Sequence, residues 1–445
     1  MALKVVNTES LDAVANAINS KAGTSGKLQF PDGFVEAVEG ISAGGGGDGY
    51  DVATLQKFVD SRGANGLDYL YKGNLSTPSE KNLTNSDLEW LTKVDLSNCT
   101  TARYMFSGCE SDNLTEIPLF DMSHITDMQY MFEGYSNNSG RGAYLTIPAF
   151  DTSNVTNMSY AFYNRLLLRF PQLKYDKAIN MSYAFYEVVF RYSTYIGFLD
   201  FPSATRCNGI FSGCDIGLKS CEGISAPNCK EFGSAFYQCS QMETVGDIIS
   251  NATGVAMNSI FYGCGMLTSF GKLPSSVSNY SYAFASCSKL TRVHALETET
   301  TTNTGNMFYQ DVALETVEYM DMRSVTSCSS MFYGCKALTN ITIKNIKCNL
   351  TVGSGTSWGH LLTVDSLVGL CYELCDTGST KTLTVGSANL TKLASVYVRS
   401  IEITDAMRAE DDLIDEKLPF EVCDSTDEGA TLIADYVLLK NWKLA

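Results

Sequence analysis

Basic residues are scarce in this chain of 445 residues, which has 32 lysines and arginines against 49 acidic residues and a net charge of −17. Such a surface repels phosphate, so the composition argues against a nucleic-acid partner and against binding to anionic lipid. Long apolar runs are also missing. No stretch approaches the ~18 residues of a membrane-spanning helix, so we expect no membrane insertion. Lys4 stands alone near the start and no apolar segment follows it, so we expect no secretion signal.

Residues suited to catalysis or cofactor binding are few. The three histidines, His124, His294 and His360, lie in unrelated contexts, which gives a catalytic triad no support. The glycine-rich stretch 43–49 is not followed by Gly-Lys-Ser/Thr and is typical of a flexible linker. Residues 402–428 are acidic without the spacing of a calcium loop, which favours a solvated face. We therefore expect a protein that is not an enzyme and has no cofactor and no metal site.

The chain is rich instead in one repeated pattern. A phenylalanine preceded by Met, Ala or Ile recurs in ten copies at spacings of 23 to 30 residues. A period near 25 lies in the range of leucine-rich repeats and is too short for helix-pair repeats. These anchor phenylalanines are Phe106, Phe132, Phe162, Phe185, Phe211, Phe236, Phe261, Phe284, Phe308 and Phe332.

Positions around the anchor predict the local structure of each repeat. Thr or Ser stands six residues before it in seven copies, and Gly stands two residues after it in five. A hydroxyl before and a glycine after a short apolar segment predict one or two helical turns with an N-cap and a left-handed end. Alternating apolar runs such as "LTEIPLF" (114–120) and "LTNITI" (338–343) follow and predict strands.

One strand and one short helix cannot bury their apolar faces alone, whereas stacked coils can. The sequence thus predicts an α/β repeat: a leucine-rich-repeat solenoid of about ten coils of ~25 residues, with a parallel sheet and short helices. A small helical N-terminal anchor and a C-terminal cap complete it. The expected domains are an N-terminal module, a glycine-rich linker, an N-terminal cap, the solenoid and a C-terminal cap with an acidic insertion, over residues 1–42, 43–50, 51–98, 99–350 and 351–445.

The 15 cysteines are spread along a large chain, and we expect mostly free thiols. Six lie three residues after an anchor. They could form a metal or redox site, or they could simply be small apolar residues that pack in the core. We favour packing, because neither zinc-finger spacing nor a histidine cluster accompanies them. Cys371 and Cys375 have helical spacing and are better explained as a core stripe. The six are Cys109, Cys214, Cys239, Cys264, Cys287 and Cys335.

The first 42 residues predict a small apolar module on a flexible tether. A helical face is followed by an aromatic turn and a second short helix. The module is too small for a sizeable core of its own, which suggests docking or oligomerisation. The residues expected to dock are Leu11, Val14, Ile18, Phe30 and Phe34.

Two resemblances follow from these residues. The segments "FDMSHITDMQYMFEG" and "MDMRSVTSCSSMFYGCKALTNI" resemble the BspA-like, Treponema-type leucine-rich repeats of bacterial surface proteins, over about residues 93–350. The segment "LDAVANAINSKAGTSGKLQFPDGFVEAVEGI" (11–41) is similar to an N-terminal module of tailed-phage tail, baseplate or fibre proteins. The first resemblance implies adhesion rather than catalysis.

Together the resemblances imply a phage virion protein, assembled in the host cytoplasm and displaying its solenoid to bind host surface molecules. Its expected partners are other virion proteins through the N-terminal module, a glycan or protein on the host surface, and further copies of itself on the particle. The alternatives are a purely structural virion component, or a bacterial adhesin at the cell surface.

The least regular coils are the expected contact surface, because repeats that break the core pattern do so for another reason. Between Phe162 and Phe201 the cysteine is replaced by Arg165 and Val188, and the segment is rich in Tyr and Arg, which are enriched at interfaces. Degenerate coils packed with aromatic residues are the alternative explanation. The predicted contact residues are Tyr135, Arg141, Arg165, Arg169, Tyr175, Arg191, Tyr192 and Tyr195.

Overall fold

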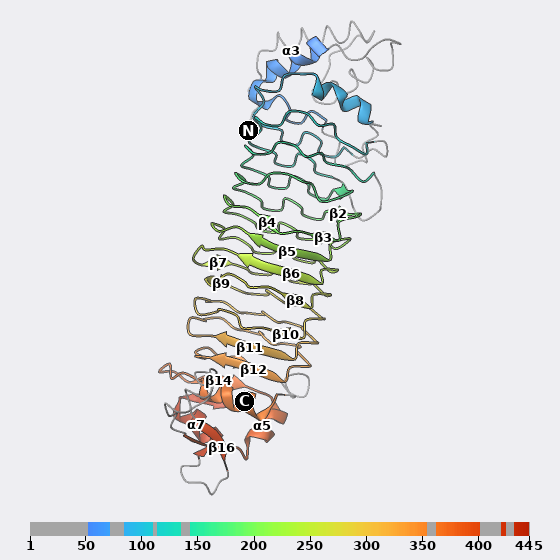
Figure 1. Ribbon diagram of the computed structural model, residues 1–445. Helices are drawn as coiled ribbons and strands as arrows, with labels where there is room; N and C mark the ends of the chain where they lie inside the picture. The colour runs from blue at the N-terminus through green and yellow to red at the C-terminus, as the bar shows by residue number, and fades with distance from the viewer. Residues whose placement is uncertain are drawn as a thin grey trace, which may run out of the picture. The chain divides into compact units, whose positions relative to one another are not determined.

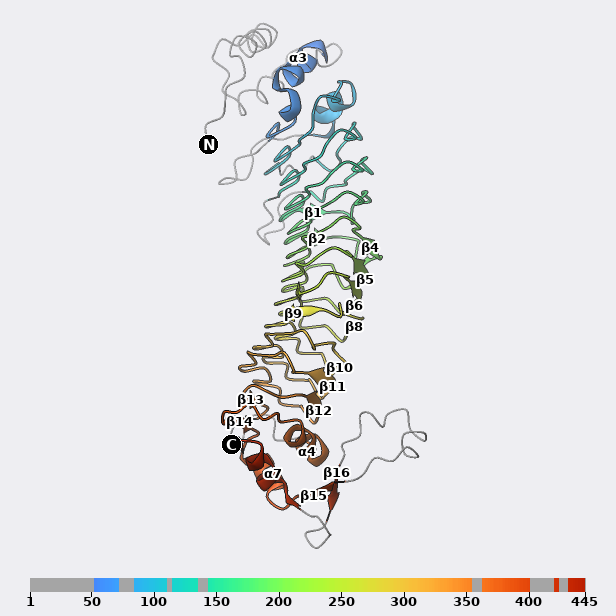
Figure 2. The ribbon, with the colours of Figure 1, turned by 90° about the vertical axis from the view of Figure 1, so that its left-hand side faces the viewer.

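A computed structural model describes residues 52–71, 84–109, 114–134, 143–353, 362–400, 420–423 and 431–444. The chain divides into two compact units, residues 1–229 and 230–445, and each is described by itself. Both contain stacked coils with parallel strands, which confirms the predicted solenoid (Figure 1, Figure 2). The predicted docking residues of the N-terminal module lie outside the described residues.

The first unit begins with helical segments and continues as coils. Helix α3 (Val52–Arg62) is followed by the 3-10 helices η1 (Gly63–Asn65) and η2 (Asn85–Thr92). The early coils pair through single parallel bridges, such as Thr101 with Asp127. Later coils carry short parallel strands, with β1 paired to β2 and both β3 and β4 paired to β5. The strands are β1 (Leu166–Leu167), β2 (Val189–Phe190), β3 (Tyr195–Ile196), β4 (Leu199–Asp200) and β5 (Ser220–Ser225).

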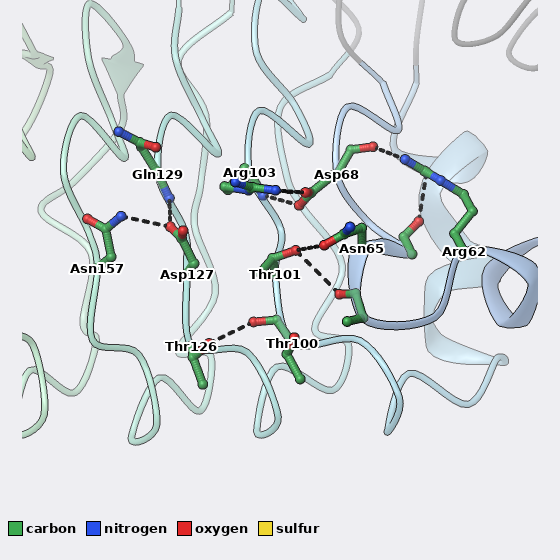
Figure 3. A network of polar contacts seen from close by, with 12 residues as sticks. Arg62, Asn65, Asp68, Thr100, Thr101, Arg103, Thr126, Asp127, Gln129 and Asn157 are labelled. Atoms are coloured by element: carbon green, nitrogen blue, oxygen red, sulfur yellow. Dashed lines mark hydrogen bonds and ion pairs between the residues drawn. The ribbon is translucent and has the colours of Figure 1, made fainter. Parts of the chain in front are cut away.

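A polar network ties the helical start of this unit to its first coils (Figure 3). The carboxylate of Asp68, which is 2% exposed, accepts hydrogen bonds from the backbone N–H of Arg103 at 2.8 Å and from its guanidinium at 2.8 and 3.1 Å. This pairing raises the pKa of Arg103. Further along, Asp127 accepts from the backbone N–H of Gln129 and the side chain of Asn157. Carboxylate side chains thus accept hydrogen bonds from backbone N–H groups of the first coils.

The second unit continues the same pattern. Strand β6 pairs with β8, β7 with β9, and β10, β11 and β12 form a three-stranded sheet, all parallel. Strand β12 overlaps the run 338–343 that the sequence predicts as a strand. Their bounds are β6 (Thr244–Ile249), β7 (Val255–Ala256), β8 (Ser269–Phe270), β9 (Val277–Asn279), β10 (Arg292–Val293), β11 (Thr316–Asp321) and β12 (Asn340–Lys344).

The C-terminal part of this unit is a mixed α/β segment. Helix α4 lies against β12, where the Thr363 N–H donates to the Thr339 carbonyl at 2.9 Å. Strands β13, β14 and β18 form a parallel sheet, and β16, β15 and β17 an antiparallel one. The bounds are β13 (Leu350–Thr351), α4 (Val364–Tyr372), β14 (Lys381–Thr384), α5 (Ser387–Leu393), β15 (Tyr397–Ser400), β16 (Phe420–Cys423), β17 (Thr431–Leu432), α7 (Ile433–Leu439) and β18 (Trp442–Leu444).

The anchor phenylalanines form the centre of the core, as the repeat predicts. They are fully buried, and neighbouring rings stack with centroids 5.2 to 5.4 Å apart from Phe106 to Phe211. In the second unit the spacing from Phe236 to Phe332 is 5.5 to 5.7 Å. Each ring therefore covers the ring of the next coil, and the stack removes a continuous apolar surface from water.

The predicted short helix around each anchor is wrong. The residue two positions before the anchor has positive φ in all ten coils, for example 55° at Tyr130, and this left-handed residue interrupts a helix. Backbone N–H groups alternate instead. Met131 donates three residues back to Met128, whereas Phe132 donates to Ala161 of the next coil at 2.7 Å. The segment is thus a chain of tight turns that shares its hydrogen bonds with neighbouring coils.

The threonines ahead of the anchor do not cap helices either. The hydroxyl of Thr302 donates to the carbonyl of Ser278 in the preceding coil at 3.1 Å, and that of Thr326 donates to Thr302 at 3.1 Å. The backbone N–H of each of these threonines donates to the same carbonyl at 2.9 Å. The hydroxyl is therefore selected for bonding between coils rather than for the start of a helix.

Candidate functional site

The cysteine positions are packing positions, as the sequence predicts. All six predicted cysteines are buried. The thiol of Cys264 donates to the carbonyl of the preceding anchor, Phe236, at 3.0 Å, and Cys335 does the same to Phe308 at 3.0 Å. Burial raises the pKa of these two thiols far above the ordinary range. Such thiols stay protonated and are unsuited to nucleophilic chemistry or metal binding.

The other candidate groups form no reactive cluster in the part of the chain that the structure describes. Among the described residues, no group of three or more His, Cys, Asp or Glu could hold a metal ion. His124 is exposed, His294 lies 3.1 Å from a carboxylate oxygen of Glu318 on the surface, and His360 is outside the described residues. Cys371 is buried in α4, but the helix ends at Tyr372 and Cys375 is half-buried beyond it, so the predicted helical stripe is wrong for Cys375. Twelve described cysteines are free, and Cys328 and Cys348 form a disulfide.

Asp311 takes the position of the thiol in the coil between Cys287 and Cys335, and it is fully buried. Its Oδ1 accepts from the backbone N–H of Cys287 at 2.7 Å, while Oδ2 has no hydrogen-bond partner among the described residues. Burial raises the pKa of Asp311 well above its ordinary value. The carboxyl is therefore held as the neutral acid at a pH where an exposed aspartate is ionised.

Replacing Asp311 by cysteine is expected to raise the free energy of unfolding at pH 7 by about 1–3 kcal/mol, because it removes a buried, half-satisfied polar group. The pKa of Asp311 is higher in the folded chain than in the unfolded chain. Its stabilising contribution is therefore complete below the unfolded value of 3.8 and is lost as the pH rises. Urea unfolding at pH 4 and pH 8 measures both effects.

Asp311→Asn is the control, because asparagine keeps the shape but does not titrate. The stability difference between this variant and the wild type should change with pH. A difference that stays constant from pH 4 to pH 8 would contradict the buried neutral acid.

An irregular coil in the first unit builds the candidate site. Strand β2 pairs backwards with β1, and the Tyr192 N–H still donates to the Leu168 carbonyl at 3.1 Å. Two residues later, the Thr194 carbonyl accepts a hydrogen bond from the backbone N–H of Lys219 in the following coil at 2.8 Å. Strand β3 then pairs with β5 of that coil. The hydroxyl of Ser193 accepts the Phe170 N–H at 2.8 Å. The Phe190 N–H already donates to Ile216 of the following coil at 3.4 Å, but the strand pairing itself passes from the preceding coil to the following one at residues 191–194. We call this point the pairing switch.

This switch places tyrosine and arginine side chains together on the surface. Arg169 and Arg191 each have their guanidinium carbon 5.7 Å from the centre of the Tyr192 ring, and Arg191 also lies 5.0 Å from the ring centre of Tyr144. Tyr192 is 57% exposed, and both arginines are exposed as well. Cation–π contacts therefore hold two guanidinium groups at solvent-facing positions.

Two further aromatic rings extend this surface along the same coil. Tyr195 is 54% exposed and Phe198 is 48% exposed. Glu222 of the following coil accepts the Phe198 N–H at 3.1 Å and also accepts a hydrogen bond from Tyr195, which raises the pKa of that phenol. The carboxylate of Glu222 thus fixes the segment that carries both rings. We call Tyr144, Arg169, Arg191, Tyr192, Tyr195 and Phe198 the Tyr–Arg surface.

The predicted contact residues divide into three groups. Arg169, Arg191 and Tyr192 lie together, and Tyr195 is exposed three residues further along the coil, while their role in binding stays a prediction. Tyr135 and Arg141 lie outside the described residues.

Arg165 does not belong to the surface. It is 3% exposed, and its Nη1 donates to the carbonyl of Cys109 at 2.6 Å, because it occupies the cysteine position and turns inwards. Tyr175 is half-buried, packs edge-on against Phe201 at 5.3 Å and donates to the Pro171 carbonyl. These two side chains fit the alternative explanation, in which degenerate coils are packed with large residues.

Sequence reasoning did not name Tyr144 and Phe198 as contact residues, although Phe198 lies within the irregular segment between Phe162 and Phe201 that was singled out. It also missed a stack of tyrosines, four of them two residues before an anchor and the first, Tyr69, two residues before Tyr71, whose ring centroids lie 4.7 to 4.9 Å apart. Their recurrence at one position could have revealed them. The rings cover one another's faces, so the stack supports the coils more than it offers a binding platform. Its members are Tyr69, Tyr104, Tyr130, Tyr160 and Tyr183.

Residues 211–339 match the family "BspA type Leucine rich repeat region" in six copies, which confirms that resemblance there. Residues 100–220 match "Mycoplasma protein of unknown function, DUF285". The crystal structure of a leucine rich cell surface protein from Faecalibacterium prausnitzii A2-165 is similar over 53% of this chain and 84% of that chain, with 17% identity and a TM-score of 0.19. No curated protein matches the chain. None of the helices in the described part has the length and apolarity needed to cross a bilayer.

Proposed function

We propose that the chain is a non-catalytic binding protein whose repeats hold the Tyr–Arg surface towards a ligand on a cell surface. The observation that carries the proposal is the exposed cluster of Arg169, Arg191 and Tyr192 at the pairing switch. The resemblance to BspA-type repeats of bacterial surface proteins supports it, since it implies adhesion.

The geometry suits recognition for two physical reasons. Tyrosine and arginine bring large contact areas and directional polar groups, and they dominate the binding energy of many interfaces. The two guanidinium groups already rest on a tyrosine ring, so little side-chain freedom is left to lose when a ligand binds. The coils beneath, with their stacked anchors Phe162 and Phe185, provide a rigid support.

The triple substitution of Arg169, Arg191 and Tyr192 by alanine is expected to weaken binding to cells at least about tenfold, because these exposed side chains are the proposed ligand contacts. Flow cytometry with labelled protein measures the effect on bacterial and mammalian cells. The matched control is Arg292→Ala with Tyr282→Ala in the other unit, where both side chains are also exposed. Equal binding by both variants and the wild type would contradict the proposal.

The particle that displays the protein is a separate question. The phage prediction rests on residues 11–41, which lie outside the described residues, and BspA-type repeats fit the alternative of a bacterial surface adhesin. If the chain is a virion protein, deleting residues 1–40 should release it from particles, because the predicted docking residues go with them. Co-sedimentation with purified virions tests this. A deletion variant that stays bound to particles, or a wild type that never binds them, would contradict docking to a virion through this module and would favour the bacterial adhesin.

A further inference from the structure

Two arginines of the Tyr–Arg surface, Arg169 and Arg191, form no ion pair with a carboxylate among the described residues, while Glu222 is bonded to Tyr195 and Phe198 further along the coil. Elsewhere, Arg103 is paired with Asp68, Arg292 with Glu318, and Arg323 with Asp321 and Glu299. Arg169 and Arg191 instead face a tyrosine ring, and the part of the chain that the structure describes offers them no ion pair. The chain as a whole has a net charge of −17, so this is an unusual place for two neighbouring cations.

We infer that this surface binds an acidic glycan through the carboxylate of a uronic or sialic acid, an inference that rests on the proposed function. A guanidinium is planar and can donate two parallel hydrogen bonds to a carboxylate, and two guanidinium groups on one ring can hold one or two such groups. The rest of the chain is acidic and repels polyanions, so an acidic glycan should be attracted only to the Tyr–Arg surface.

The neighbouring rings favour a sugar over an acidic peptide. The exposed ring of Tyr192 lies against both arginines, and Tyr195 and Phe198 expose their rings three and six residues further along the same coil. The apolar C–H face of a pyranose can pack on such rings. A peptide commonly binds by adding a strand to an open sheet edge. Strand β2 is paired with β1, and β3 with β5, and the segment between them bonds to both neighbouring coils, so the site presents side chains rather than a strand edge.

The test uses the full chain and defined probes in isothermal titration. Polygalacturonate is the carboxylate polymer, and its fully methyl-esterified form is the matched control, with the same sugar but no charge. Sialyllactose and lactose repeat this comparison with the other acid sugar. Poly-glutamate and dextran sulfate represent an acidic peptide and a sulfated glycan. Binding to at least one carboxylated sugar, lost at least about tenfold with its neutral counterpart and weakened by salt, is the expected result.

Two substitutions separate recognition from simple attraction. Arg169→Lys with Arg191→Lys keeps both charges but loses the planar donor pair, so affinity for the acid sugar should fall. Full affinity in this variant would overturn the inference, as would equal binding of the ester, or preferred binding of poly-glutamate or dextran sulfate.

The failure of this inference is distinguishable from the failure of the proposed function. If the triple alanine variant loses cell binding while no carboxylated sugar binds or competes, the surface binds a ligand of another class and only the glycan inference fails. If cell binding is indifferent to the triple substitution, both fail. Circular dichroism of each variant confirms that the fold is retained.

Discussion

Replacing Phe162 by alanine is expected to lower the free energy of unfolding of the first unit by about 3–5 kcal/mol. Its ring is 1% exposed and stacks on Phe132 at 5.3 Å and on Phe185 at 5.2 Å. Truncation therefore leaves a cavity between two coils and removes both ring contacts. Each coil is supported only by its neighbours, so the loss should interrupt the stack at this point.

Urea unfolding measures the loss, and hydrogen exchange by mass spectrometry locates it in residues 52–229. Tyr163→Ala is the matched control, because the next ring along the chain is half-buried, stacks on Tyr186 at 5.1 Å and packs edge-on against Tyr160 at 6.0 Å. We expect this control to cost about 1–2 kcal/mol, the size of two partly exposed aromatic contacts. Equal losses in the two variants would show that the anchors are not the centre of the core.

Replacing Asp68 by asparagine is expected to destabilise the start of the first unit by about 2–3 kcal/mol. The carboxylate accepts three hydrogen bonds from Arg103, and the amide would turn a donor towards the guanidinium. Breaking a fully buried ion pair costs ~3–5 kcal/mol. The expected loss is smaller here, since the Arg103 side chain is 38% exposed and water can solvate it.

The control is Asp151→Asn, which breaks an ion pair with Lys174 whose side chains are 59% and 47% exposed. An exposed pair of this kind contributes roughly 0–1 kcal/mol, so its unfolding curve should hardly move. Proteolysis near residue 100 should accelerate in Asp68→Asn alone. If both variants unfold like the wild type, the network in Figure 3 does not hold the first coils.

The repeat, the anchor and most inward residues can be predicted from the sequence alone. They depend on a recurring pattern of an apolar anchor, a cysteine three residues later in six of the ten coils, and alternating apolar residues. Burial of Phe106, Cys109 and Ile117 follows from that pattern alone, because stacking coils is the only way to remove such residues from water. The sequence also directed attention to the irregular segment that contains Arg191 and Tyr192.

The tertiary structure decided which partner each polar group takes. Thr302 bonds to Ser278, 24 residues earlier, so its hydroxyl resembles a helix cap in the sequence while serving the preceding coil. A left-handed residue at Tyr130 ended the predicted helix, since the next coil offers its N–H groups other acceptors. The direction of the side chains was decided in the same way. Arg165 turned inwards because the carbonyl of Cys109 lies within reach of its guanidinium, whereas Arg191 lies exposed against the Tyr192 ring at the pairing switch.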